Sequence, residues 1–251
     1  MLPSVGGGTM GQTLAGKVAL VTGAGKRMGR SIALRLASDG ADVIVNYESS
    51  KPQAEDVVAQ IRAIGRKSAA IQADVTQRKE VQSMFAAVEA QFGRLDVLVN
   101  NAGMFFHAEF EELTEEQWDR ILDVNLKSQM LCAQAAVPLM RRGGGGHIIN
   151  ISSLGGLLAW PGYTHYCVSK AGVIMLTRCL ASALGPDILV NSVAPGTIQF
   201  PDEPPDEDYI RRVPLHRTGT GEDIADTVAF LAQSKFITGQ IIPVDGGRTL
   251  V

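Results

Sequence analysis

Residues 18–30 read VALVTGAGKRMGR, an apolar run followed at once by a glycine-rich turn and then by a helical pattern. We expect a buried strand over Val18–Thr22 and a helix over Ser31–Ser38, because a continuous apolar run gives way to helical spacing. Gly23 permits a sharp turn, and Gly29 lets the helix approach the strand closely. The unpaired N–H groups at the start of such a helix favour an anion. This arrangement predicts a binding site for the pyrophosphate of a dinucleotide.

Apolar, β-branched runs recur along the rest of the chain and alternate with amphipathic helical patterns. Most of the runs are too uniformly apolar for strands with one exposed face, so we expect a parallel sheet covered on both sides. Right-handed crossovers then give an α/β, Rossmann-type doubly wound fold with a mostly seven-stranded parallel sheet. The expected strands are Val18–Thr22, Val43–Asn46, Ser68–Gln72, Val97–Asn100, His147–Ile151, Leu189–Ala194 and Gln240–Val244.

A chain of 251 residues can bury one continuous core, and no linker divides this one. We therefore expect a single domain over residues 14–251, preceded by a flexible glycine-rich extension over residues 1–13. Residues 199–214 carry four prolines and five acidic residues, so we expect them to lie outside the core. A segment in this place is suited to cover a substrate, and we expect a lid over about residues 197–214. A solvated surface loop is the alternative.

The composition excludes several classes of function. A net charge of −3 offers no basic field for a phosphate backbone, so we expect no nucleic-acid partner. The apolar stretches are short and interrupted by glycine or charge, so we expect none to reach the roughly 20 residues of a membrane span. The three cysteines form no C-x-x-C pair, which favours a reducing compartment, the cytoplasm by default. The four histidines lack the spacing of metal ligands, and we expect no metal site.

Thr22 to Gly29 resembles the TGxxxGxG signature of the short-chain dehydrogenase/reductase family, and the resemblance extends from Lys17 to Gly247. Arg27 replaces the middle glycine, which gives the TGxxxRxG form of the pteridine-reductase branch. A guanidinium there would lie beside the pyrophosphate or over the nicotinamide site. The resemblance implies hydride transfer between a nicotinamide cofactor and a carbonyl or alcohol. The turn residues that it assigns to the cofactor are Gly23, Gly25, Lys26, Arg27, Met28 and Gly29.

The end of the second expected strand bears on the choice between NADP(H) and NAD(H). By resemblance, Tyr47 occupies the position of the family's acidic residue, so the carboxylate that selects NAD is missing. Lys26 stands where many NADP-using members have a basic residue, and Ser49 can donate a hydrogen bond to a phosphate. Glu48 favours NAD(H) instead, because related NADP-using enzymes often carry a neutral or basic residue at its position. We expect NADP(H) to be favoured over NAD(H).

Other stretches resemble the family's remaining cofactor contacts. Asp74 and Val75 resemble the pair that recognises adenine, and residues 100–103 resemble the NNAG turn around the adenine ribose. Pro195 and Gly196 resemble the turn against the nicotinamide, although Phe200 replaces a common threonine, whose contact Thr197 or the backbone would have to supply. The implied contacts are Asp74, Val75, Asn101, Ala102, Gly103, Pro195, Gly196 and Ile198, with Tyr166 and Lys170.

Tyr166 and Lys170 lie four residues apart in a helical pattern that runs through Leu180, so their side chains share one face. A free phenol has a pKa of about 10, and we expect the neighbouring ammonium to lower the pKa of Tyr166. Seen alone, such a pair is more often surface packing. The resemblance adds Ser153, which would donate to the substrate carbonyl, and Asn125, which would hold a water linked to Lys170. These four residues are the predicted catalytic set.

In the direction of reduction, we expect Tyr166 to donate a proton to the carbonyl oxygen and Ser153 to stabilise the growing charge, while the cofactor delivers a hydride. Phe105 follows the NNAG turn, and in pteridine reductases an aromatic residue at this position stacks on a flat substrate. Ser153, Phe105 and Tyr166 are therefore the predicted substrate contacts. Apolar packing beneath the lid is the alternative interpretation of Phe105.

Three functions compete at this stage. Residues 45–50 and 214–221 resemble 3-oxoacyl-carrier-protein reductases and sugar or polyketide ketoreductases, and a ketoreductase of the 3-oxoacyl-carrier-protein type is the favoured function. Arg27 and Phe105 support a pteridine reductase-like enzyme instead, but Ser153 stands where the protozoal enzymes of that branch carry an acid. A non-catalytic dinucleotide-sensing regulator would not need the full catalytic set. The resemblance also implies a homotetramer, joined through helices corresponding to Glu115–Met140 and Thr164–Ala183.

Overall fold

A seven-stranded sheet forms the centre of the structure, a computed structural model that describes residues 13–200 and 203–251. The strands are ordered β3-β2-β1-β4-β5-β6-β7, and every neighbouring pair is parallel. Most of the predicted extension, residues 1–12, lies outside the described part. The strands are β1 (Val18–Val21), β2 (Asp42–Tyr47), β3 (Ser68–Gln72), β4 (Val97–Asn100), β5 (Gly146–Ile151), β6 (Ile188–Pro195) and β7 (Ile241–Val244).

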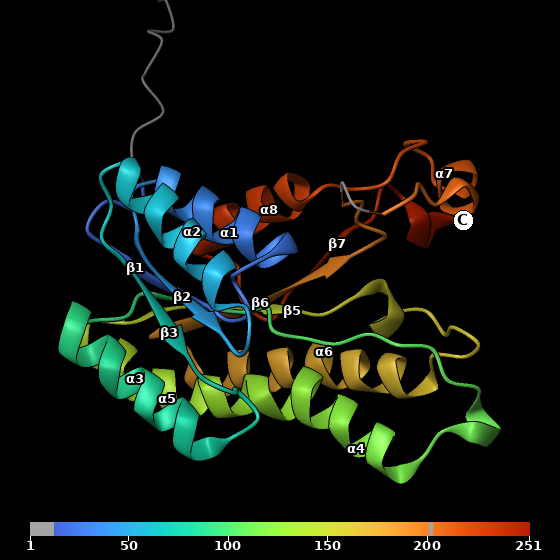
Figure 1. The fold of residues 1–251 in the computed structure, drawn as a ribbon, viewed down its shortest axis with the longest axis horizontal. Helices are drawn as coiled ribbons and strands as arrows, with labels where there is room; N and C mark the ends of the chain where they lie inside the picture. The colour runs from blue at the N-terminus through green and yellow to red at the C-terminus, as the bar shows by residue number, and fades with distance from the viewer. Residues whose placement is uncertain (1–12, 201–202) are drawn as a thin grey trace, which may run out of the picture.

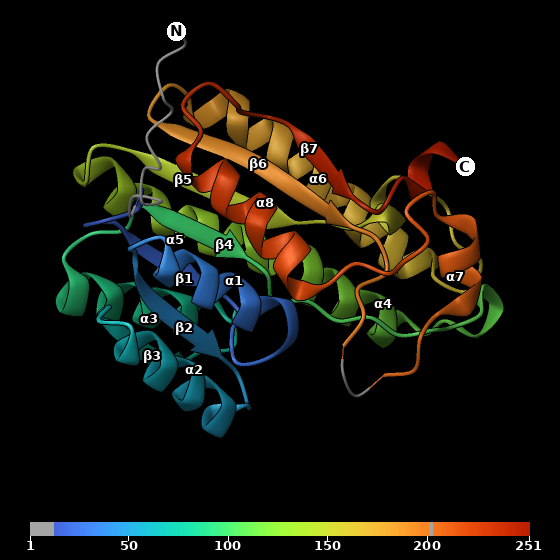
Figure 2. The same ribbon diagram turned by 90° about the horizontal axis from the view of Figure 1, so that it is seen from above.

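Helices cover both faces of the sheet (Figures 1 and 2). In Figure 1, α1, α2 and α8 lie above the sheet, whereas α3, α4, α5 and α6 lie below it. The predicted doubly wound fold is therefore confirmed. The helices are α1 (Arg27–Ser38), α2 (Lys51–Ala63), α3 (Arg78–Phe92), α4 (Glu115–Leu122), α5 (Ser128–Arg142), α6 (Thr164–Leu184), α7 (Glu207–Arg212) and α8 (Gly221–Gln233).

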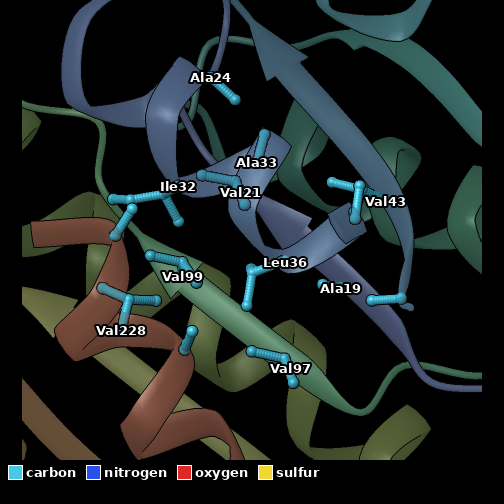
Figure 3. Close-up of a cluster of buried hydrophobic side chains, with 14 of the residues drawn as sticks. Ala19, Val21, Ala24, Ile32, Ala33, Leu36, Val43, Val97, Val99 and Val228 are labelled. Carbon is cyan, nitrogen blue, oxygen red and sulfur yellow. The ribbon is translucent and has the colours of Figure 1, made fainter. Parts of the chain in front are cut away.

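The uninterrupted apolar strands follow from this double cover. Successive side chains of a strand point to opposite faces, so both faces need apolar residues. In β1, Ala19 and Val21 belong to the core that contains residues of α1 and α8, whereas Val18 and Leu20 belong to the core that contains residues of α3 and α5. Figure 3 shows the first of these cores around Val21, with Val228 of α8 beside it.

Several predicted boundaries differ from the structure. The helix expected from Ser31 begins at Arg27, so its first turn lies within the glycine-rich segment. The stretch Glu115–Met140 is not one regular helix, because a π-helical turn, η2 (Asp123–Lys127), separates α4 from α5. The expected lid contains α7, and residues 201–202 of it lie outside the described part. Val213 is fully buried against Gly246, so the end of this segment does enter the core.

The expectation that no apolar segment is long enough to span a membrane is wrong for α6. This helix has 21 residues and is apolar enough by length and composition alone. One such helix is weak evidence of a membrane span, because helices that pack in a protein core pass the same test. In this fold α6 packs against β6, and Lys170 and His165 are buried within it.

Candidate active site

The turns that follow β1, β2, β3 and β4 enclose a cavity of about 680 Å³. Open parallel sheets bind ligands at the carboxyl ends of their strands where the strand order reverses, here between β1 and β4. Sequence reasoning missed Ser50, Arg120 and Asp123, which also line the cavity. The predicted cofactor residues that the structure brings together here are Gly23, Lys26, Arg27, Met28, Gly29, Tyr47, Ser49, Asp74, Val75, Asn101, Ala102 and Gly103.

Side-chain hydrogen bonds join the turn after β1 to the turn after β4. The hydroxyl oxygen of Thr22 accepts from the backbone N–H groups of Asn101 and Ala102, each at 2.9 Å. The Asn101 amide donates to the Thr22 carbonyl at 2.9 Å, and the Gly23 N–H donates to the Asn46 side chain at 3.2 Å. The two turns are therefore held in place before any ligand binds.

The start of α1 has the properties that a pyrophosphate site requires. Lys26 precedes the helix in an extended conformation, and its side chain does not cap the helix. The N–H groups of the first turn therefore remain for an anion. Gly29 has no room for a side chain, since a Cβ atom would lie 2.6 Å from the Asn101 amide nitrogen and 2.9 Å from the Ala24 Cα. These residues fit a dinucleotide.

Gly25 and Arg27 have contacts that the sequence did not predict. A Cβ atom on Gly25 would meet the Ser50 hydroxyl at 2.7 Å, so Gly25 packs against the start of α2 and does not line the cavity. Arg27 has a φ of 53°, a left-handed conformation that glycine adopts without strain. Its guanidinium forms an ion pair with Glu203 at 2.6 Å and lies 5.0 Å from the centre of the Phe200 ring. In this structure Arg27 therefore binds the segment after β6, in a place the sequence did not predict.

The residues expected to select the cofactor gather at the end of β2. Tyr47 is buried, and its side chain belongs to the hydrophobic core. Lys26, Glu48 and Ser49 are exposed around the same end of the cavity. A 2′-phosphate would therefore meet one ammonium, one hydroxyl and one carboxylate.

Asp74, predicted to contact adenine, is held by a local turn. One oxygen of its carboxylate accepts from the N–H of Thr76 at 2.9 Å and from the Thr76 hydroxyl at 2.7 Å. Its own backbone N–H donates to Glu80 at 2.7 Å. These bonds orient the carboxylate and leave its second oxygen for a ligand.

The predicted nicotinamide contacts after β6 lie apart from the cavity. Pro195 ends β6, and the Tyr209 hydroxyl of α7 covers Gly196 while it donates to the Asp245 carbonyl at 2.7 Å. Ile198 forms an isolated bridge with Gly219. The structure therefore places Gly196 against Tyr209 of the predicted lid, and Ile198 within the first residues of that lid.

The four predicted catalytic residues come from three parts of the fold and meet at the end of β5. Lys170 of α6 is buried, and its ammonium donates to the Ile151 carbonyl at 3.0 Å. Its nitrogen lies 5.8 Å from the centre of the Tyr166 ring. Ser153, just after β5, forms a hydrogen bond with the Tyr166 phenol. The Asn125 side chain in η2 accepts from the Met104 N–H at 2.8 Å and donates to the Met104 carbonyl at 3.0 Å.

Burial dominates the electrostatics of this group. It raises the pKa of Tyr166 to about 12, and the hydrogen bond with Ser153 offsets only part of that rise. It lowers the pKa of Lys170 from 10.5 to about 8. The expected lowering of the Tyr166 pKa is therefore wrong for this structure, because the removal of the phenol from water outweighs the contributions that favour the phenolate.

The fold and this site define a class of protein. A doubly wound sheet with a dinucleotide-type turn after its first strand, and a half-buried tyrosine beside a buried lysine and a buried serine, defines a nicotinamide-dependent oxidoreductase. Within residues 13–200 and 203–251, no group of three or more His, Cys, Asp or Glu side chains could hold a metal ion.

Comparisons with known proteins agree with this class. A family model described as enoyl-(acyl carrier protein) reductase matches residues 23–249. The chain is 48% identical to the 3-oxoacyl-[acyl-carrier-protein] reductase FabG of Staphylococcus aureus, over 92% of this chain and 97% of that protein. It is 40% identical to a 3-oxoacyl-[acyl-carrier-protein] reductase of Synechocystis, over 94% and 98% of the two chains.

Solved structures of similar fold also cover most of the chain. A variant of a Serratia marcescens short-chain dehydrogenase/reductase superposes with a TM-score of 0.90 at 37% identity, covering 94% of this chain and 99% of that one. The acetoin dehydrogenase of Enterobacter cloacae superposes with a TM-score of 0.87 at 37% identity, covering 93% and 96%. The chain belongs to the short-chain dehydrogenase/reductase family. It is an oxidoreductase that transfers a hydride between a nicotinamide cofactor and a carbonyl or alcohol.

Proposed function

We propose that this protein is an NADPH-dependent ketoreductase of the 3-oxoacyl type, in which Tyr166 is the proton donor. The observation that carries the proposal is the meeting of Tyr166, Ser153, Lys170 and Asn125 at one end of β5. A bound dihydronicotinamide would supply the hydride. The relatives from Staphylococcus and Synechocystis, named as 3-oxoacyl-carrier-protein reductases, support this substrate type over a pteridine.

Tyr166, Ser153 and Lys170 each have a separate role in the transfer of the proton. A phenol with a pKa of about 12 keeps its proton at neutral pH, so Tyr166 is ready to donate it to a carbonyl oxygen. The Ser153 oxygen accepts from the Gly155 N–H at 3.0 Å, which orients the hydroxyl, and its hydrogen can stabilise charge on the same substrate oxygen. With a pKa of about 8, Lys170 is mostly charged at neutral pH and favours the phenolate left after transfer.

Asn125 positions the turn after β4. Besides its two bonds to Met104, its amide donates to the Ser169 hydroxyl at 3.1 Å, and Ser169 donates to the Tyr166 carbonyl at 2.7 Å. This chain of bonds links the NNAG turn to the first turns of α6. Asn125 therefore keeps Tyr166 and Lys170 in register with the cofactor turn, in addition to the predicted water contact.

The preference for NADPH rests on Lys26 and Ser49 at the open end of the cavity, and on Tyr47 standing where a carboxylate would select NAD. A blue fluorescent protein solved in complex with NADPH supports it, because it superposes with a TM-score of 0.87 at 37% identity. We extend the proposal to a cytoplasmic homotetramer. Its contact surface would include α6, on which Val168, Met175 and Cys179 are exposed.

The test is the variant Tyr166→Phe, assayed for consumption of NADPH with acetoacetyl thioester, dihydrobiopterin and a panel of simple ketones. We expect wild-type turnover on the thioester, a loss of about 10²- to 10⁴-fold in kcat in the variant, and nearly unchanged NADPH affinity. Lys51→Met, at a position on α2 whose side chain is 64% exposed, is the control and should keep full activity. Wild-type activity in Tyr166→Phe would refute the role of the phenol. NADPH binding without turnover on any substrate would point to a sensor.

A further inference from the structure

Aromatic rings surround the phenol that the sequence singled out. Phe105 meets the Tyr166 ring edge to face, with centroids 4.7 Å apart and an interplanar angle of 77°. The Trp160 ring lies 6.1 Å away and nearly parallel to it, at 14°. Tyr163 joins the two, because it stacks on Phe105 at 4.7 Å and meets Trp160 edge-on at 6.3 Å. We call Phe105, Trp160 and Tyr163 the aromatic wall.

The backbone around the wall is shaped for these rings. A Cβ atom on Gly155 would come within 3.0 Å of the Tyr166 ring and 3.1 Å of the Trp160 ring, so the absence of a side chain lets both rings settle there. Gly162 has a φ of 73°, and a Cβ atom on it would overlap the His107 ring, which packs edge-on against Tyr163. The Ala108 N–H donates to the Gly162 carbonyl at 2.9 Å and ties the two segments together.

The wall is not ordinary core packing. Phe105 is 56% exposed, and Trp160 and Tyr163 are half-buried. The neighbouring Phe106, by contrast, packs its ring against the buried His165, at a centroid distance of 4.4 Å. A large apolar ring left exposed beside a reactive group offers its surface to a ligand.

We propose that the aromatic wall selects carbonyl substrates in which a flat aromatic group is attached at the carbonyl carbon. The inference rests on the proposed function, since it assumes that Tyr166 protonates the substrate oxygen. A substrate oxygen at the Tyr166 hydroxyl would bring the substituents of the carbonyl carbon close to the aromatic wall. The centroids of the Phe105 and Trp160 rings lie 4.7 and 6.1 Å from the centroid of the Tyr166 ring. Rings attract each other in stacked or edge-on arrangements beyond the burial of their area.

The reaction keeps its balance whatever the substituent. A bound dihydronicotinamide would supply the hydride that the carbonyl carbon gains, and Tyr166 gives its phenolic proton to the oxygen. The C=O double bond becomes a C–H and an O–H bond, and the products are a secondary alcohol and the oxidised cofactor. The wall therefore affects binding and orientation and adds no chemical step.

A matched set of free 3-oxo esters separates this inference from the proposed function. The substrates are ethyl acetoacetate, ethyl benzoylacetate and ethyl 3-cyclohexyl-3-oxopropanoate, which differ only in the group on the ketone. The measured quantity is kcat/KM for NADPH consumption, expressed as the ratio of the phenyl to the cyclohexyl ester. Comparing this ratio between enzymes cancels the intrinsic reactivity of the two ketones. The variants are Phe105→Leu, Trp160→Leu and, as a control, Phe110→Leu, whose ring is 68% exposed.

We expect the phenyl to cyclohexyl ratio to fall by about 2- to 12-fold in Phe105→Leu, the range of one aromatic pair. It should fall in Trp160→Leu as well and stay at the wild-type value in Phe110→Leu. Reduction of the esters with an unchanged ratio in both wall variants would overturn the inference and leave the proposed function standing. If the wild-type protein reduces none of the esters and no acetoacetyl thioester, the proposed function fails first.

Discussion

Lys170 is a buried cation, and its titration should make the free energy of unfolding depend on pH. The residue is 5% exposed, its ammonium donates to the Ile151 carbonyl at 3.0 Å, and burial lowers its pKa from 10.5 to about 8. Between these two values the unfolded chain binds a proton that the folded protein does not, so the free energy of unfolding rises with pH across this window. From about pH 7 to about pH 9.5, Lys170 alone should contribute a rise of about 2 kcal/mol.

The variant Lys170→Met keeps an unbranched, mostly apolar side chain and removes the titration. Urea unfolding of both proteins without cofactor, over a series of pH values, should show the stability of the wild type gaining about 2 kcal/mol relative to the variant as pH rises. Lys51→Met, at a position whose side chain is 64% exposed, is the control, and its difference from the wild type should stay flat. Parallel curves for the wild type and Lys170→Met would refute the desolvation of this ammonium.

Two further substitutions test the cofactor site. Lys26→Ala should weaken NADPH binding by about tenfold, through loss of a charge-assisted contact, and leave NADH binding unchanged, whereas the control Lys51→Ala should alter neither. Titration with each cofactor measures the affinities. Equal losses of NADPH and NADH affinity in Lys26→Ala would contradict a contact between Lys26 and the 2′-phosphate. Gly29→Ala should destabilise the protein by about 1 to 3 kcal/mol in urea unfolding, because its Cβ would lie 2.9 Å from the Ala24 Cα. Gly143→Ala, whose Cβ would meet its nearest neighbour at 3.4 Å, should stay close to the wild type, and equal effects would contradict the packing argument.

The fold was predictable because its signals are local. A continuous apolar run, a glycine turn and a helix start all depend on residues that neighbour each other in the chain, and the seven predicted strands appear with boundaries shifted by one residue at most at either end. The shared face of Tyr166 and Lys170 is also local, since helical periodicity alone places residues four apart together.

Other properties depend on contacts between distant segments. The Arg27 guanidinium pairs with Glu203, which no spacing within the turn could have indicated. The π-helical turn that carries Asn125 interrupts a stretch whose sequence reads as one helix. The aromatic wall required Phe105 and Tyr163, far apart in the chain, to stack on each other.

The pKa of Tyr166 shows most clearly what the sequence determines and what only the tertiary structure determines. Sequence spacing correctly placed an ammonium on the same helical face, and from that alone a lowered phenol pKa follows. The packed protein adds what spacing does not contain, namely the removal of water from the phenol and an Ile151 carbonyl that holds the ammonium. Local periodicity determines which groups can be neighbours, whereas desolvation depends on the whole set of segments packed around them, and here desolvation sets the direction of the shift.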